Sequence, residues 1–253
     1  MKKAILLSTL LFSTTIFAES FNESKKLLKE IYKDHQVTFY CGCKYNPFDK
    51  DNMIDRDSCG YVPRNELTKK GKENLRANRI EWEHIMPAEN FGKHLPCWQN
   101  GGRKACEKDP LFNKMEGDMH NLVPAIGELN ADRSNFRYGA DKPKNKMYGE
   151  CKFEIDFDAN RAYVRDEIKG DIARAYLYMS KTYNINLSDQ ERKMMEAWDK
   201  QDPIDEWEIE KNRRIEKLKA IKEALAGGMS KAAICRTFGV KRSTLIDSLR
   251  RDS

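Results

Sequence analysis

The sequence predicts an α+β fold held together by disulfide bonds, and three observations lead to this class. Residues 22–34 and 168–183 repeat apolar side chains at the spacing of an α-helix. Residues 153–167 alternate in two pieces, as a β-hairpin does. Six of the seven cysteines lie in the first two thirds of the chain. The 253 residues suffice for one large core and a small appendage.

Residues 1–18 have the three parts of a signal peptide. Lys2 and Lys3 give a positive start, an apolar run follows, and Ala18 is a small residue at the cleavage point. A membrane-anchoring helix is the alternative, but the run is shorter than the roughly 20 residues that a span requires. We therefore expect a periplasmic or secreted protein with no membrane span after the leader is removed.

The cysteines agree with export. Cys235 stands alone near the end, and the other six form an even set that indicates disulfides in an oxidising compartment. Pairing of Cys97 with Cys106 is favoured because Gly101 and Gly102 let the chain double back, and the remaining pairs stay open. A zinc site is the alternative, but its ligands would be too closely spaced and too few are histidine. The even set is Cys41, Cys43, Cys59, Cys97, Cys106 and Cys151.

The elements follow in order along the mature chain. Leu27, Leu28 and Ile31 mark the helix over residues 22–34. Residues 34–43 are expected to form a short strand that enters a turn pinned by cysteines. Ile80 and Trp82 favour a strand that Pro87 ends.

The second half of the chain continues with a hairpin and two helices. The hairpin over residues 153–167 turns at residues 158–160, and a buried helix follows at residues 168–183. Asp202 as N-cap and Pro203 in the first turn predict a further helix that runs to the Gly227-Gly228 pair.

Charge is distributed unevenly. Residues 211–253 hold twelve Lys and Arg and four Asp and Glu, a net charge of +8, whereas residues 19–210 carry a net charge of −4. The basic balance therefore belongs to the tail, and it suggests a polyanionic partner.

The run Glu81-Trp82-Glu83-His84 is the first candidate for chemistry. A regular strand points Glu81 and Glu83 to one face and His84 to the other, so Glu83 and His84 share a site only where the strand bends or ends. The alternative is that Trp82 belongs to the core and the polar residues are solvated. Residues 101–135 add Arg103, Glu116, Asn130 and Arg133, and also His120 and Asn121, which we expect to hydrogen-bond a loop.

Five blocks of sequence resemble the endonuclease I family of periplasmic and secreted bacterial DNases over roughly residues 22 to 214. The blocks are EWEHIMPAENFG, CWQNGGRKAC, MEGDMHNLVPAIGELNADRSNFRYG, GDIARAYLYM and EAWDKQDPIDEWE. The resemblance implies a mixed helical and strand nuclease domain with an embedded ββα-metal core that holds one divalent ion, usually Mg²⁺, which Mn²⁺ or Ca²⁺ can replace.

The resemblance also assigns roles. It implies that Glu83 and Asn130 ligate the metal, that His84 activates water, that Arg103 contacts the phosphate, and that Glu116 lies beside the metal. A hard ion such as Mg²⁺ needs only one or two protein oxygens, and a neutral imidazole with a pKa of about 6.5 can accept a proton from water.

The resemblance implies substrates and products as well. It gives single- and double-stranded DNA as substrates, leaves RNA open, and predicts 5′-phosphate ends. We further expect Arg133 to contact nucleic acid and the protein to act as a monomer.

The chain departs from that family at its C-terminus. Residues 229–253 resemble the helix-turn-helix of site-specific resolvases and invertases, with Lys241, Arg242, Ser243 and Thr244 at the start of a DNA-reading helix. A plain helical hairpin is the alternative. The expected organisation is a leader (1–18), a nuclease domain (19–210), a helical linker (211–228) and an all-α helix-turn-helix tail (229–253).

Two other function classes compete with a nuclease. A DNA-binding protein that acts through the tail alone leaves the leader and six cysteines unexplained. A secreted binding module without catalysis has no need of Glu83, His84 and Asn130 together. An exported, metal-dependent endonuclease therefore explains most of the sequence.

Overall fold

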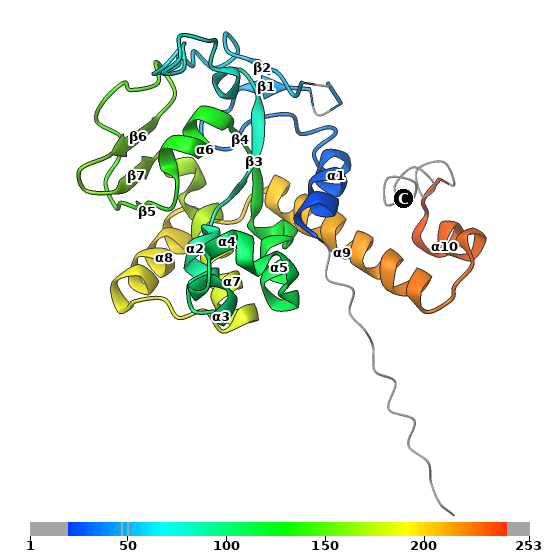
Figure 1. Cartoon of the computed structure of the whole chain (residues 1–253). Helices are drawn as coiled ribbons and strands as arrows, with labels where there is room; N and C mark the ends of the chain where they lie inside the picture. The colour runs from blue at the N-terminus through cyan, green and yellow to red at the C-terminus, as the bar shows by residue number, and fades with distance from the viewer. Residues whose placement is uncertain (1–19, 47, 50, 242–253) are drawn as a thin grey trace, which may run out of the picture.

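The computed structural model describes residues 20–46, 48–49 and 51–241, and Figure 1 shows their arrangement. The helices are α1 (Phe21–Ile31), α2 (Ala88–Gly92), α3 (Pro96–Gln99), α4 (Gly102–Ala105), α5 (Pro110–Glu116), α6 (Gly127–Arg133), α7 (Lys169–Tyr183), α8 (Asp189–Gln201), α9 (Glu206–Ala226) and α10 (Lys231–Phe238). Short 3-10 helices are η1 (Leu75–Ala77), η2 (Cys106–Lys108), η3 (Met119–Asn121) and η4 (Asp166–Ile168). The strands are β1 (Lys44–Tyr45), β2 (Ile54–Asp55), β3 (Ile80–His84), β4 (Leu122–Ile126), β5 (Arg137–Tyr138), β6 (Phe153–Asp156) and β7 (Arg161–Val164). The leader lies outside the described residues.

The strands of the described residues form three small sheets, so the fold is a mixed α+β fold. β1 pairs with β2, β3 pairs antiparallel with β4, and β7 lies between β6 and a parallel β5. Helix α6 follows β4 directly and lies beside the β3–β4 pair (Figure 1). Two antiparallel strands and a helix are therefore neighbours in space. None of the described helices is long and apolar enough to cross a membrane.

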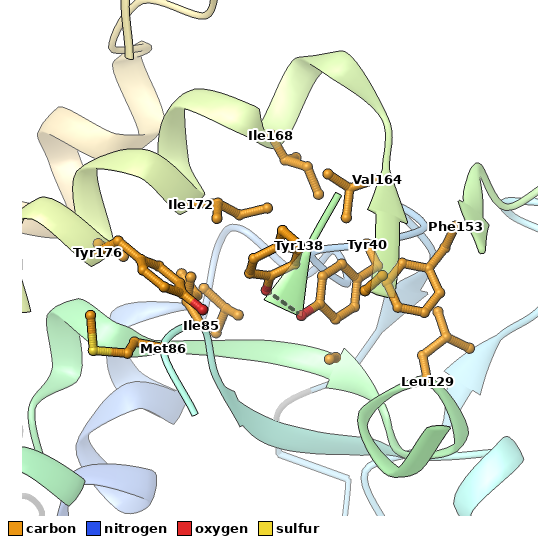
Figure 2. Packing of buried hydrophobic residues seen from close by; sticks show 14 of the residues in the cluster. Tyr40, Ile85, Met86, Leu129, Tyr138, Phe153, Val164, Ile168, Ile172 and Tyr176 are labelled. Carbon is orange, nitrogen blue, oxygen red and sulfur yellow. Dashed lines mark hydrogen bonds between the residues drawn. The ribbon is translucent and has the colours of Figure 1, made fainter. Parts of the chain in front are cut away.

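Two clusters of buried side chains hold the domain together. Figure 2 shows part of the larger cluster, in which Tyr40 and Tyr138 lie between α7 and the strands, with their hydroxyl oxygens 2.8 Å apart. The second cluster lies beneath α1 and joins Leu28 to Trp82 of β3 and Ile215 of α9. Both faces of β3 are thus covered.

Three predicted elements are confirmed. Helix α1 begins with a capping box between Ser20 and Glu23 and buries Leu27, Leu28 and Ile31. Strands β6 and β7 form the expected antiparallel hairpin. Helix α7 covers residues 169–183, and its residues Ile172, Tyr176 and Met179 are buried. In each case the apolar period decided the element.

The strand expected at residues 34–43 does not form. The Thr38 nitrogen donates to the Cys43 oxygen at 2.8 Å, and Gly42 adopts the left-handed region with φ of 73°. The segment therefore folds back on itself, and only an isolated bridge between Val37 and Lys44 remains. A turn this tight leaves too few residues for a ladder.

The helix expected from Asp202 begins later. Asp205 is the N-cap of α9 and shares a capping box with Glu208. Asp202 instead accepts a hydrogen bond from the Gly170 nitrogen at 2.8 Å, at the start of α7. Its backbone oxygen lies so close to Gly170 that a Cβ there would meet it at 2.0 Å. Asp202 is thus held by α7 and is not free to cap α9.

The cysteines pair as an exported chain predicts. Cys97 bonds Cys106, as expected, and the other pairs are Cys41–Cys151 and Cys43–Cys59. Cys235 is free. The pair that spans residues 41 to 151 joins the turn after α1 to the start of the β6–β7 hairpin.

The tail is described as far as Lys241. Helix α10 buries Ile234 against Ile221 of α9, and Phe238 and Val240 pack on the same cluster. The linker expected at residues 211–228 is the continuation of α9 followed by the turn at Gly227 and Gly228. Residues 242–253, which include most of the predicted DNA-reading helix, lie outside the described residues.

Candidate active site

Strand β3 carries the candidate residues and ends at His84. Trp82 and His84 point toward α1, where Trp82 packs 5.5 Å from Tyr32 between ring centroids. Glu81 and Glu83 point to the other face, which α6 covers, because their carboxylates bind residues of that helix. The alternation of a strand therefore places the two carboxylates and the imidazole on opposite faces.

His84 is a buried imidazole with one defined hydrogen bond. Its Nε2 lies 2.8 Å from the Glu116 backbone oxygen, and the residue is 7% exposed. Burial lowers the pKa of His84 to about 3, so the ring is neutral near pH 7. A carbonyl oxygen only accepts, so Nε2 carries the proton and Nδ1 keeps the lone pair. The imidazole can therefore act as a base through Nδ1.

Two aromatic rings hold the imidazole. The Phe21 ring lies 4.8 Å from it and the Phe91 ring 6.0 Å, between centroids. Two cations also make cation–π contacts with the Phe21 ring. The Lys25 Nζ lies 4.7 Å and the Arg103 Cζ 5.5 Å from its centroid. Burial and the positive charge of Arg103 lower the pKa of Lys25. Sequence reasoning missed Phe21 and Lys25, since neither belongs to a recognisable motif.

Glu116 connects His84 with Arg103. Its backbone oxygen binds His84, and its carboxylate accepts from the Arg103 Nε at 2.6 Å. The Arg103 side chain is 50% exposed, so its guanidinium can reach a ligand from solvent. The predicted residues His84, Arg103 and Glu116 are thus neighbours.

Glu83 is a buried carboxylate of which only one oxygen is hydrogen-bonded among the described residues. Its Oε1 accepts from the Arg133 Nη1 at 2.8 Å and from the Tyr40 hydroxyl at 3.1 Å. Burial raises the pKa of Glu83, and Arg133 opposes that shift. The Oε2 atom has no hydrogen bond among the described residues, so one oxygen remains available.

Asn130 faces the same side of β3 from α6. Its Nδ2 lies 3.4 Å from the Glu81 Oε2, and its Oδ1 accepts no hydrogen bond from the described residues. Arg76 and Arg79 also bind Glu81, at 2.9 and 3.2 Å, so Glu81 is the more occupied of the two carboxylates.

The chemical types of Glu83 and Asn130, a carboxylate and a carboxamide, suit a hard cation that retains water. The described residues contain no group of three or more His, Cys, Asp or Glu arranged around a metal position. Magnesium commonly uses one or two protein oxygens and keeps several waters, so a carboxylate and a carboxamide meet its needs.

Arg133 corrects one expectation. Its side chain is 0% exposed and donates to Glu83, to the His84 oxygen at 2.8 Å and to the Ile85 oxygen at 2.6 Å. A guanidinium enclosed in this way cannot reach DNA. It holds the end of β3 by binding the Glu83 carboxylate and the backbone oxygens of His84 and Ile85.

The other predicted polar residues divide into two groups. Asn121 is buried and hydrogen-bonds the backbone of Met86 at 2.7 and 2.9 Å, as expected for loop support. Lys241 is exposed, and Arg242, Ser243 and Thr244 lie outside the described residues. A cavity of about 490 Å³ between the segment at residues 35–39, α7 and α9 is lined by His120 but by none of the residues predicted to hold the metal, activate water or contact DNA.

Comparison with known proteins shows which family and which relatives the chain is similar to. The profile of the family described as Endonuclease I matches residues 19–222. The chain is 50% identical to an extracellular deoxyribonuclease of Aeromonas hydrophila over 201 residues, 79% of this chain and 84% of that protein. It is 50% identical over 214 residues to a periplasmic deoxyribonuclease of the same organism, covering 83% and 87% of the two chains. It is 44% identical over 197 residues to the Endonuclease-1 of Buchnera aphidicola subsp. Acyrthosiphon pisum, covering 78% and 76%.

Proposed function

Because the chain belongs to the endonuclease I family, we propose that it is an exported endonuclease that hydrolyses phosphodiester bonds in DNA and leaves 5′-phosphate ends. The relatives named extracellular and periplasmic deoxyribonuclease support both the substrate and the compartment. Single- and double-stranded DNA are the proposed substrates of a monomer, and RNA stays open.

The observation that carries the proposal is the state of His84. Its ring is neutral, its Nε2 is bound to the Glu116 oxygen, and its Nδ1 keeps a lone pair. In the proposed reaction Nδ1 takes a proton from a water molecule whose oxygen attacks the phosphorus. A positioned base of this kind contributes about 10² to 10⁴ in rate.

Arg103 supplies the second proposed role. Its half-exposed guanidinium binds a non-bridging phosphate oxygen, which orients the scissile bond toward His84. As the new P–O bond forms, the bond from phosphorus to the 3′ oxygen breaks. The phosphate then stays on the 5′ oxygen of the downstream fragment, and the upstream fragment ends in a 3′ hydroxyl.

Glu83 and Asn130 would hold a divalent ion, with Mg²⁺ as the first candidate and Mn²⁺ or Ca²⁺ as substitutes. When bound, such an ion stabilises the charge on the phosphate and on the leaving 3′ oxygen. Arg133 keeps the Glu83 carboxylate in place and favours its charged form, and Tyr40 fixes the same oxygen (Figure 2 shows Tyr40 with its partner Tyr138).

Incubation of the purified mature protein with plasmid DNA tests the proposal. We expect nicking and linearisation with Mg²⁺ and none with EDTA, and 5′-phosphate ends that ligase accepts. Cleavage that persists in excess EDTA would contradict the metal-dependent mechanism. Absence of cleavage with every divalent ion tried would contradict the proposal that the protein is a nuclease.

A further inference from the structure

The end of the chain is rich in cations and poor in carboxylates, unlike residues 19–210 taken as a whole. No Asp or Glu occurs between Glu223 and Asp247, and this stretch contains Lys231, Arg236, Lys241 and Arg242. Residues 19–210 carry a net charge of −4. The family profile ends at residue 222, so this stretch is an addition to the common nuclease fold.

The added residues, together with the preceding turns of α9, form a folded arm, which we define as residues 216–241. Ile221 and Ile234 are buried in its small core, and Leu225, Phe238 and Val240 pack around them. Ser230 caps α10 by accepting from the Ala233 nitrogen at 3.2 Å. Gly239 ends the helix with φ of 58°. The arm is therefore a packed unit and not an extended tail.

Helix α9 joins the arm to the nuclease domain without a break. Its Ile215 is buried in the cluster beneath α1, and its Arg214 binds the Ile31 oxygen at 2.6 Å. Figure 1 shows α9 leaving the body of the protein with α10 against its far end. A continuous helix fixes the distance and direction from the arm to the active site.

The arm presents cations that no carboxylate of the described residues neutralises. Lys231, Arg236 and Lys241 are exposed and make no ion pair within that part of the chain. On α9 itself the pattern differs, since Arg214 pairs with Asp34 at 2.5 Å and Lys219 with Glu216 at 3.2 Å. Three exposed cations without an ion pair among the described residues thus lie on α10 and directly after it.

We propose that the arm holds the phosphate backbone of DNA and thereby keeps the substrate close to the active site. The inference rests on the proposed nuclease function, because DNA is the polyanion that the enzyme must approach. Lysine and arginine side chains gain affinity for DNA by releasing condensed counterions. Because α9 is continuous, no flexible linker has to be ordered when both surfaces engage one DNA molecule.

An acidic membrane surface fits the arm less well. Helices that bind membrane surfaces present a row of large apolar side chains beside their cations. In the described part of the arm, Met229 is the one large apolar side chain that is exposed, at 39%. A cationic surface with no row of exposed apolar side chains is better suited to DNA than to a membrane.

The test removes the three charges without disturbing the core. The variant combines Lys231→Gln, Arg236→Gln and Lys241→Gln. The matched control combines Lys181→Gln, Lys193→Gln and Lys200→Gln, three exposed lysines of α7 and α8 that lie away from the arm. Both variants change the net charge by the same amount. Binding to a labelled duplex is measured across salt concentrations in the full-length chain with His84→Ala added, and cleavage is measured with His84 intact.

The arm variant should raise KM for DNA and leave kcat unchanged, because tethering affects capture and not chemistry. Its plot of log affinity against log salt should be shallower by about 0.9 for each phosphate that the variant no longer neutralises. The control should resemble the parent.

Equal effects in both variants, or an unchanged slope in the arm variant, would overturn the proposal. Binding of the arm to vesicles of acidic lipid but not to DNA would overturn it as well. A wrong nuclease assignment would give a different result. The unmodified protein would then bind DNA through the arm but would not cut it.

Discussion

The Nε2 of His84 lies 2.8 Å from the backbone oxygen of Glu116, whose carboxylate binds Arg103 at 2.6 Å. One glutamate thus orients the proposed base through its main chain and the proposed phosphate ligand through its side chain. The two functions are separable, because substitution of a side chain leaves its backbone oxygen in place.

Replacement of His84 by alanine should abolish most cleavage and preserve the fold. The expected loss is about 10² to 10⁴ in rate, the usual contribution of a positioned base. Initial rates on plasmid DNA with Mg²⁺ measure it, and circular dichroism checks the fold. His94→Ala is the matched control, since His94 is exposed and should tolerate the change. Near-normal rates in His84→Ala would remove His84 from its proposed role.

Segments with a clear apolar period could be predicted from the sequence, and short ones could not. Helix α7 repeats buried residues over 15 positions, whereas α3 has four residues and too little length for a period. Helices α2 to α5 depend on the cysteine pair and on packing around Phe112. Asp202 shows the same limit at a helix end, because its partner Gly170 is 32 residues away in the sequence.

The site divides in the same manner. Glu83, His84 and Asn130 are selected because their residue types suit the chemistry and occur within matching blocks, and their roles stay predictions. Arg133 was misassigned, since nothing local reveals that it lies against Glu83, 50 residues earlier. Phe21 could not be found either, because its ring reaches His84 only after α1 docks on β3.

Glu83→Gln should reduce both activity and apparent affinity for Mg²⁺, and Glu81→Gln should matter much less. Glutamine keeps an acceptor for Arg133, whereas alanine would leave a buried unpaired charge that costs about 3 to 5 kcal/mol. Loss of a residue that merely supports a metal ligand costs about 10- to 100-fold in affinity, so a direct ligand should cost at least this. Cleavage rates measured over a range of Mg²⁺ concentrations give the apparent affinity for the ion and the maximal activity of each variant. Equal losses in the two variants would show that the choice of Glu83 is wrong.

Phe21→Ala should lower kcat by up to about 100-fold with little change in KM. The ring is 4.8 Å from His84, and misplacement of a reacting group by about 1 Å can cost this much. Phe21→Leu should restore part of the rate, because a large apolar side chain still fills the space. Phe48→Ala, at an exposed phenylalanine, serves as the control. A change confined to KM would assign Phe21 to DNA binding and not to the positioning of His84.

Cys235 should be the only thiol that reacts in the unfolded, unreduced protein. The other six cysteines form three disulfides, and loss of one native disulfide typically costs about 2 to 5 kcal/mol. Labelling in guanidinium without reductant, read by mass spectrometry, should give one adduct per chain. Two or more adducts on the oxidised protein would contradict the pairing, and Cys235→Ser should give none.

Stability should fall as the solution is acidified, and His84 should account for a measurable part of the loss. Its pKa is lowered by burial to about 3 in the folded protein, below the value of 6.5 for a free imidazole. Between these two values the unfolded chain binds a proton that the folded chain excludes, so the free energy of unfolding decreases by about 1.4 kcal/mol per pH unit as pH falls. Urea unfolding in EDTA at pH 7 and pH 5 should therefore show a loss about 2 kcal/mol larger in the parent than in His84→Gln. The pKa of Asp171 is raised to about 7 by burial, which has the opposite sign, but both proteins share it and it cancels in the difference. An identical pH dependence in the two proteins would mean that burial does not lower the pKa of His84, which would contradict the enclosed position of its ring.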